Sequence, residues 1–232
     1  MKKKVLDHQD SLDFLNSSIY ANSTQYWQNY WLNPLPLVNQ FEYRYPDFND
    51  IKTLFKSIRV KNILDIGCGN GAISFELARL NYKVTGIDVS PVAISQACGK
   101  SSNDEFDVDF DCGDVLDMPY PYGSFDAGLA FYIFEFLTFD LASYLVNQLK
   151  SIIMPGGLLV SSISTIDRDK FLNYEVLPDD TLILKDENQQ GMFYHFYTEA
   201  KILSLFINWQ VKEITRLDND KYLIVARNFS NN

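Results

Sequence analysis

Positive charge is scarce in this sequence. Its 20 Lys and Arg residues stand against 30 Asp and Glu residues, which leaves a formal net charge of −10 at pH 7. A net acidic chain has no overall attraction to phosphate backbones or anionic lipids. Nucleic acids and membrane surfaces are therefore not expected partners, although a local basic patch would override that average.

Cysteine pairs and long apolar runs are absent as well. The three cysteines, Cys68, Cys98 and Cys112, form no C-x-x-C pair and leave an odd thiol, which argues against a zinc site and for a reducing compartment. The basic start MKKK has no apolar run behind it, and no apolar run approaches the roughly 18 residues that span a bilayer. We expect a soluble, cytoplasmic protein without a metal, and the sequence leaves its oligomeric state open.

Two alternating patterns organise the chain from residue 61 onward. Short apolar runs typical of strands occur at residues 61–67, 82–89, 107–113, 125–132 and 156–164. Segments with helical spacing lie between them, such as AISFELARL and LASYLVNQLKSII. Strand and helix in alternation predict a doubly wound α/β fold, with a mostly parallel sheet covered by helices on both faces.

The rhythm changes after Ser164. The runs TLILK and GMFYHFY flank the polar turn DENQQ and predict a β-hairpin inserted at about residues 165–197. A short helix follows with Thr198 as its N-cap, and then WQVKEI and KYLIVAR predict a C-terminal antiparallel pair. Residues 1–50 are rich in large aromatic rings and predict an N-terminal cap that belongs to the same domain as residues 51–232.

The loop in ILDIGCGNG, residues 63–71, is the first candidate binding feature. Its glycines are spaced G-x-G-x-G and no lysine follows, so it is not a P-loop for nucleotide triphosphates. Ala72 stands where a dinucleotide loop has its third glycine, and the tolerated G-x-G-x-x-A variant keeps NAD possible. A glycine-rich turn that binds no ligand is a further possibility.

Three acidic residues narrow the choice of ligand. Asp65 precedes the glycines, Asp88 ends the second strand run, and Asp114 follows the third. An acid at the second position accepts hydrogen bonds from ribose hydroxyls, whereas Asp65 would repel a pyrophosphate and attract a cation. The three acids therefore favour an adenosine that carries positive charge over NAD, although Asp65 could instead be a helix N-cap.

Four motifs in order, ILDIGCGNG, GIDVS, CGDVLDMPYPYGSFD and MPGGLLV, resemble those of class I S-adenosylmethionine-dependent methyltransferases. The resemblance covers roughly residues 60–165 and implies a seven-stranded Rossmann-like sheet, S-adenosylmethionine as cofactor and S-adenosylhomocysteine as product. Within that class the chain is most similar to tellurite-resistance-type, small-molecule and protein-lysine methyltransferases. In the tellurite-resistance type an acid completes the capping box that Thr198 begins, whereas Lys201 stands there in this chain.

The resemblance also implies a cofactor site. Asp65 would lie near the amino-acid portion of the cofactor, the turn at residues 67–71 would lie under its methionine and ribose, and Asp88 would bind the ribose hydroxyls. Asp114 would accept from the adenine amino group while the Val115 N–H meets a ring nitrogen. The full implied set is Asp65, Gly67, Cys68, Gly69, Gly71, Asp88, Val89 against the adenine, Asp114, Val115, and Ala130 and Phe131 beside the methyl donor.

Catalytic residues are less strongly indicated, because methyl transfer needs mainly alignment of the nucleophile and exclusion of water. Tyr132 and Glu135, just after the fourth strand run, and His195, on one predicted strand face with Phe193 and Tyr197, are candidates for a base or a substrate contact. A packing role for His195 and a solvent-exposed position for Glu135 are the alternatives.

The aromatic cap adds a second set of candidates. Trp27, Tyr30 and Tyr43 could close over the cofactor, since aromatic faces attract a sulfonium or an amine. A hydrophobic cap at one end of the sheet is the alternative.

The sequence therefore supports an active methyltransferase on a small molecule or protein side chain. A non-catalytic S-adenosylmethionine-binding regulatory module and an NAD(P)-dependent oxidoreductase remain as alternatives. The fourth strand run is followed by no Asn-Pro-Pro-Tyr signature, which argues against methylation of nucleobases or glutamine amides and leaves the acceptor open.

Overall fold

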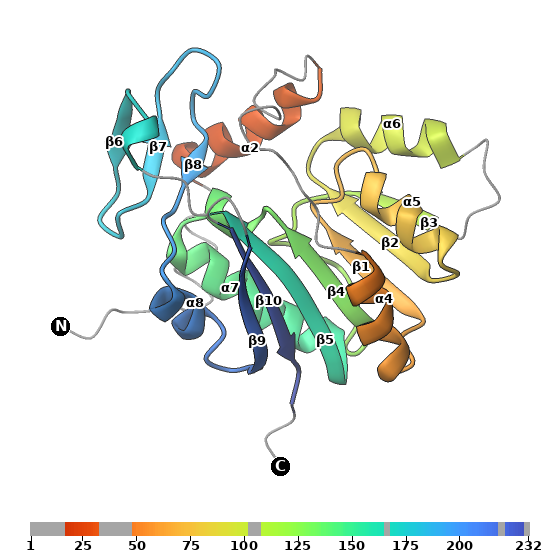
Figure 1. Ribbon diagram of the computed structural model, residues 1–232. Coiled ribbons are helices and arrows are strands. Elements are labelled where there is room, and N and C mark those ends of the chain that lie inside the picture. The colour runs from red at the N-terminus through yellow and green to blue at the C-terminus, as the bar shows by residue number, and fades with distance from the viewer. Residues whose placement is uncertain (1–16, 33–47, 102–107, 165–167, 218–220, 230–232) are drawn as a thin grey trace.

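A seven-stranded sheet in the order β3-β2-β1-β4-β5-β10-β9 forms the centre of the computed structural model (Figure 1). The structure describes residues 17–32, 48–101, 108–164, 168–217 and 221–229. The strands are β1 (Asn62–Ile66), β2 (Lys83–Asp88), β3 (Val108–Cys112), β4 (Phe125–Phe131), β5 (Ile153–Ser164), β9 (Gln210–Leu217) and β10 (Lys221–Arg227). Strands β1 to β5 pair in parallel, and β10 pairs antiparallel with both β5 and β9. The predicted mostly parallel sheet with a C-terminal antiparallel pair is thereby confirmed.

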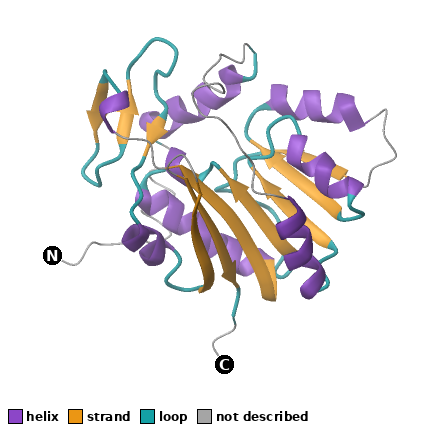
Figure 2. Cartoon of the chain, in the orientation of Figure 1, coloured by secondary structure: helices purple, strands orange, loops and turns teal. Residues whose placement is uncertain are grey.

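Helices cover both faces of this sheet (Figure 2). They are α4 (Phe48–Ser57), α5 (Ala72–Arg79), α6 (Pro91–Ser101), α7 (Phe139–Ile152) and α8 (Glu199–Leu205). Phe55 of α4 and Leu77 of α5 are fully buried in one core cluster, and Leu145 of α7 and Ile202 of α8 are fully buried in the other. Two cores on opposite faces are what a doubly wound sheet requires. Of the described helices, none has the length and apolar character that crossing a bilayer demands.

Two additions lie beyond the carboxyl ends of the parallel strands. Helix α2 (Ser18–Tyr30) is capped by Ser17, whose side chain accepts from the Tyr20 N–H. A small antiparallel sheet contains β6 (Tyr174–Val176), β7 (Leu182–Leu184) and β8 (Phe193–Tyr194). The predicted hairpin corresponds to β7 and β8, while β6 was not predicted because its residues, Tyr-Glu-Val, form no apolar run. Figure 1 shows α2 running between this small sheet and α6.

Candidate functional site

A cavity of about 520 Å³ opens where β1, β2 and β4 end, beneath helix α2. Its size is ordinary for a small-molecule or cofactor site. The walls come from the glycine loop, three carboxylates, the inner face of α2 and the segment after β4. Among the described residues that line it, none is a Lys, Arg or His.

The glycine loop approaches the cavity closely because its backbone adopts left-handed conformations. Gly67 has φ +68° and Gly69 has φ +54°, a region that only glycine enters at little cost. A Cβ on Gly67 would lie 2.1 Å from Cδ1 of Ile133, and one on Gly69 would lie 2.5 Å from the Trp31 indole. The backbone N–H groups of Gly67 and Cys68 donate to the Ile87 carbonyl at 2.8 and 3.0 Å, which fixes the loop against β2.

Asp88 is the last residue of β2 and lies beside this loop. Its Oδ2 accepts from the Gly69 N–H and its Oδ1 from the Ser90 N–H, both at 2.9 Å. Burial raises the pKa of this carboxyl, whereas the two N–H donors lower it. A carboxylate offers about four acceptor positions, so each oxygen retains capacity for a hydroxyl of a ligand.

Asp65 belongs to β1 and faces the same cavity. The Ser74 hydroxyl donates to its Oδ2 at 2.5 Å. Burial and the neighbouring Asp88 raise the pKa of the Asp65 carboxyl to about 6, against the effect of the Ser74 hydrogen bond. Gly71 occupies the N-cap position of α5, so Asp65 is not its N-cap residue, although its carboxylate also accepts from the backbone N–H of Ser74 in the first turn.

Asp114 lies two residues beyond β3 and is already hydrogen-bonded. Its Oδ1 accepts from the Leu116 N–H at 2.8 Å. The Tyr20 hydroxyl donates between the two carboxylate oxygens, 2.8 Å from Oδ2 and 3.0 Å from Oδ1. Tyr20 was missed by sequence reasoning, although it shares a helical spacing with Trp27 and Tyr30, which were predicted.

Helix α2 covers the cavity with one face. Tyr20, Ser23, Thr24, Trp27 and Tyr30 recur every three or four residues and, together with Trp31, contribute to its wall. The Trp27 ring meets the Phe136 ring edge-on, with centroids 4.7 Å apart. The helix is also tied to α6, because Gln96 Nε2 donates to the Trp31 carbonyl at 3.3 Å.

The segment after β4 completes the wall. Tyr132 lines the cavity with φ +58°, a conformation that is costly for a bulky side chain and is found most often at functional sites. Its N–H donates to the Ser162 carbonyl at 3.3 Å. The Lys221 ammonium lies 5.3 Å from the centroid of its ring, in the range of a cation–π contact.

Residues 63–157 match the family model described as a methyltransferase domain. Over these residues the chain is similar to class I S-adenosylmethionine-dependent methyltransferases. Ajmaline N-methyltransferase of Rauvolfia serpentina is 34% identical over 112 residues, which cover 47% of this chain and 38% of that protein. Ubiquinone biosynthesis O-methyltransferase of Xanthomonas campestris is 35% identical over 107 residues, covering 46% and 43%. The chain spans less than half the length of these two relatives.

A solved structure supports the same fold. A methyltransferase of Methanosarcina mazei, described as SAM-dependent, superposes with a TM-score of 0.63 at 21% identity. The match covers 72% of this chain and 92% of that protein. At this identity the likeness shows the fold alone.

The cavity of the methyltransferase domain fits S-adenosylmethionine, the cofactor of this family. Asp88 retains acceptor capacity beside the glycine loop, and Gly67 and Gly69 of the loop carry no Cβ that would project toward Ile133 and Trp31 of the cavity wall. The carboxylates suit a cationic ligand and disfavour a pyrophosphate, because like charges repel strongly in a partly dry site.

Most of the predicted cofactor residues of the domain lie together, and the roles assigned to them remain predictions. Those that line the cavity are Asp65, Gly67, Cys68, Gly69, Asp88, Val89, Asp114, Val115 and Phe131. Two do not: Gly71 caps α5, and Ala130 belongs to the core on the α7 side of the sheet. Ala130 faces away because successive side chains of a strand point to opposite faces, and Phe131 takes the cavity side. Trp27 and Tyr30 of the cap line the cavity, whereas Tyr43 lies outside the described residues.

Glu135, a predicted catalytic candidate, is fully buried behind the cavity wall and does not line it. It lies in the short 3₁₀ helix η1 (Phe134–Phe136), so the solvent-exposed alternative is wrong. Its Oε1 accepts from the Ser164 N–H at 3.0 Å, and within the described part of the chain its Oε2 has no hydrogen-bond partner. Burial raises the pKa of the Glu135 carboxyl to about 8, although the N–H donors and Lys221 lower it.

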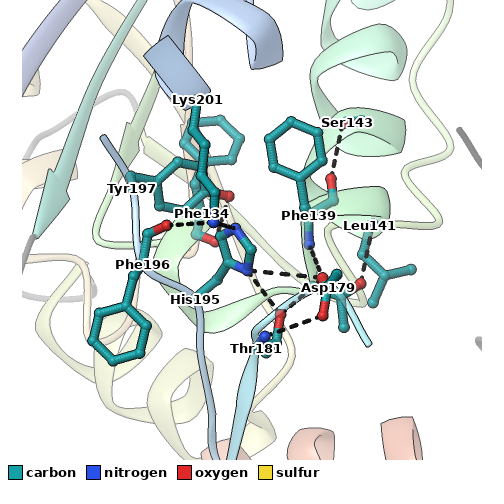
Figure 3. A network of polar contacts seen from close by, with 11 residues as sticks. Phe134, Phe139, Leu141, Ser143, Asp179, Thr181, His195, Phe196, Tyr197 and Lys201 are labelled. Carbon is teal, nitrogen blue, oxygen red and sulfur yellow. Dashed lines mark hydrogen bonds and ion pairs between the residues drawn. The ribbon is translucent and has the colours of Figure 1, made fainter. Parts of the chain in front are cut away.

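His195 also lies away from the cavity, in the buried network of Figure 3. Its Nε2 is 3.3 Å from the Lys201 ammonium, which can only donate, so the proton belongs on Nδ1. Nδ1 lies 2.8 Å from the Thr181 hydroxyl, which in turn donates to Asp179 at 2.9 Å. The packing alternative therefore describes His195 better than a contact with substrate. Lys201 stands where the expected capping box would have an acid, and its ammonium group is part of this network.

Proposed function

We propose that this chain transfers the methyl group of S-adenosylmethionine to a nucleophile on a small molecule or a protein side chain. The observation that carries the proposal is the meeting of Asp65, Asp88 and Asp114 from three successive strands in one cavity. Three carboxylates and a close glycine loop suit a ligand that joins ribose, an amino-purine and a positive charge.

The chain's own residues hold the two reactants. Asp88 accepts from the ribose hydroxyls, Asp114 accepts from the adenine amino group, and Asp65 with the glycine loop faces the amino-acid portion. S-adenosylmethionine, when bound, supplies a methyl carbon that its positive sulfur already makes electrophilic. The protein needs mainly to align the nucleophile for in-line displacement at ~3–3.5 Å and to keep water out.

Aromatic side chains over the cavity keep water out. Trp27, Tyr30 and Phe136 close the side of the cavity that faces α2. A wall of aromatic rings and carboxylates favours a neutral or cationic acceptor, such as an amine or a phenol, over a phosphate or carboxylate. Two relatives, one an N-methyltransferase and one an O-methyltransferase, are compatible with this acceptor class.

Tyr132 is the candidate catalytic residue because it lines the cavity, and it could take a proton from the nucleophile only in its ionised form. A base is needed only if the nucleophile is protonated at working pH. Glu135 does not line the cavity and can act only by positioning its wall. We further propose a reducing compartment such as the cytoplasm, since Cys98 and Cys112 are exposed free thiols.

Calorimetric titration with S-adenosylhomocysteine tests the proposal. Wild type should bind, and Asp88→Ala should bind about 10- to 100-fold more weakly, because it loses hydrogen bonds to a charged acceptor. Asp109→Ala is the matched control, since Asp109 is exposed on β3 and does not line the cavity. NAD should not bind.

Three outcomes contradict parts of the proposal. If wild type does not bind S-adenosylhomocysteine, the cofactor assignment is wrong. If Asp88→Ala binds it as tightly as wild type does, the assigned site is wrong. Binding without methyl transfer to any member of a panel of amines, phenols and thiols would favour the regulatory module instead.

A further inference from the structure

The contact between Tyr20 and Asp114 joins the first turn of α2 to the strand end that would receive the adenine. Tyr20 is 8% exposed and packs in the core cluster that includes Leu64 and Ile66. Its hydroxyl lies between the two oxygens of the Asp114 carboxylate, at 2.8 and 3.0 Å. A hydroxyl in that position fixes the plane of the carboxylate as well as its charge.

The surroundings of Asp114 would otherwise favour its protonated form. Burial and the neighbouring Asp117 raise the pKa of the Asp114 carboxyl. The Leu116 N–H and the Tyr20 hydroxyl oppose this effect, because both donate to the ionised form. The difference matters chemically, since an ionised carboxylate only accepts, whereas a carboxylic acid can also donate.

The shared proton stays on Tyr20. Burial and the charge of Asp114 raise the pKa of the Tyr20 phenol above its ordinary value, so the phenol remains the donor. Asp114 therefore presents acceptor positions alone to the cavity. A ligand group that meets it must donate, as an exocyclic amine does and an oxo group does not.

We propose that Tyr20 is a specificity-determining residue that holds Asp114 as a pure hydrogen-bond acceptor, so that the site selects a 6-amino-purine over a 6-oxo-purine. This inference rests on the proposed function, because it assigns the purine edge of the cofactor to Asp114. It joins a residue of α2 to Asp114, the carboxylate beyond β3 that would read the purine. The same hydrogen bond then both holds α2 over the cavity and determines which purine base Asp114 accepts.

The test compares S-adenosylhomocysteine with S-inosylhomocysteine, in which an oxo group replaces the 6-amino group. Both dissociation constants are measured by calorimetry for wild type, Tyr20→Phe and Tyr26→Phe. Tyr26 is the matched control, because it is a buried tyrosine of the same helix that does not line this cavity. Tyr20→Phe keeps the ring and removes only the hydroxyl.

We expect wild type to prefer the adenosyl ligand and Tyr20→Phe to lose about tenfold of that preference, the worth of a hydrogen bond to a charged group. Tyr26→Phe should keep the wild-type ratio. Asp114→Asn should also lose the preference, and adding Tyr20→Phe to it should change the ratio no further. That non-additivity would identify Asp114 as the group through which Tyr20 acts.

The ratio of the two dissociation constants distinguishes a role of Tyr20 in selectivity from a role in packing alone. If Tyr20→Phe weakens both ligands by the same factor, Tyr20 only packs the helix and the inference is overturned. If wild type binds S-adenosylhomocysteine but Tyr20→Phe keeps the full ratio, the inference fails while the proposed function stands. If wild type binds neither ligand, the proposed function fails first.

Discussion

Burial raises the pKa of the Glu135 carboxyl to about 8, because its surroundings offer too little to a negative charge. Its carboxyl is fully buried, accepts one N–H from Ser164, and has Lys221 as a nearby cation. Tyr197 and Tyr132 are the phenols on the neighbouring segments. The carboxyl fixes η1, whose flanking residues form the cavity wall, so its protonation bears on the site without contact with a ligand.

The charge state of Glu135 predicts a pH-dependent stability. The folded pKa of about 8 lies above the ordinary value of 4.5, so between these values the folded chain holds a proton that the unfolded chain has lost. Stability from this group is complete below pH 4.5 and declines as the pH rises toward 8, by at most about 1.4 kcal/mol per pH unit. Glu135→Gln should remove that decline.

Urea unfolding from pH 5 to 9 measures the difference. Relative to wild type, Glu135→Gln should gain stability steadily with rising pH, while Glu213→Gln, on an exposed position of β9, should run parallel to wild type. A pH-independent offset between Glu135→Gln and wild type would contradict the raised pKa.

At the scale of elements, the β6–β8 sheet is joined to the domain through polar contacts. Asp179 accepts from the Phe139 N–H at the start of α7 at 2.9 Å. The His195 N–H donates to the Glu135 carbonyl at 2.7 Å, and the Tyr197 hydroxyl donates to the Phe134 carbonyl at 3.2 Å. The small sheet is thus tied both to α7 and to the turn that forms the cavity wall.

Thr181 is the link whose removal should loosen this attachment. It is fully buried, and its hydroxyl connects the ring of His195 to Asp179 (Figure 3). Thr181→Val keeps the shape and leaves the buried His195 ring and the half-buried Asp179 carboxylate less satisfied, which costs about 1–3 kcal/mol. Thr215→Val, at a half-buried position of β9, should cost far less.

Denaturant unfolding combined with limited proteolysis measures this effect. Cleavage in residues 185–192 should accelerate in Thr181→Val more than in Thr215→Val. Equal stability and equal cleavage of the two variants would show that the network contributes no attachment.

At the scale of the whole molecule, α2 and the sheet share one binding cavity, so ligand binding should stabilise both. A ligand that binds only the folded state adds about 2.7 kcal/mol to the unfolding free energy at 100 times its dissociation constant. We expect S-adenosylhomocysteine to raise the thermal midpoint and to slow amide exchange in α2 more than in β6–β8. A midpoint shift of the same size in Asp88→Ala would place the ligand elsewhere.

The sequence by itself determined the sheet and its direction. Period-2 and helical spacings in alternation specify parallel strands with crossover helices, because each pattern buries one face only in that arrangement. The glycine loop and the three acids could be predicted as one site because the carboxyl ends of successive parallel strands meet at one edge of the sheet. The positions of these residues follow from the path of the backbone.

Only the tertiary structure decided which side chains meet across distant elements. Tyr20 reaches Asp114 across 94 positions of the chain, and no local pattern specifies such a contact. Glu135 and His195 were sensible candidates by residue type, yet packing buried both behind the cavity wall, and the phase of β4 turned Ala130 away from it. Spacing specifies elements because it is a local property, whereas a site depends on how those elements dock.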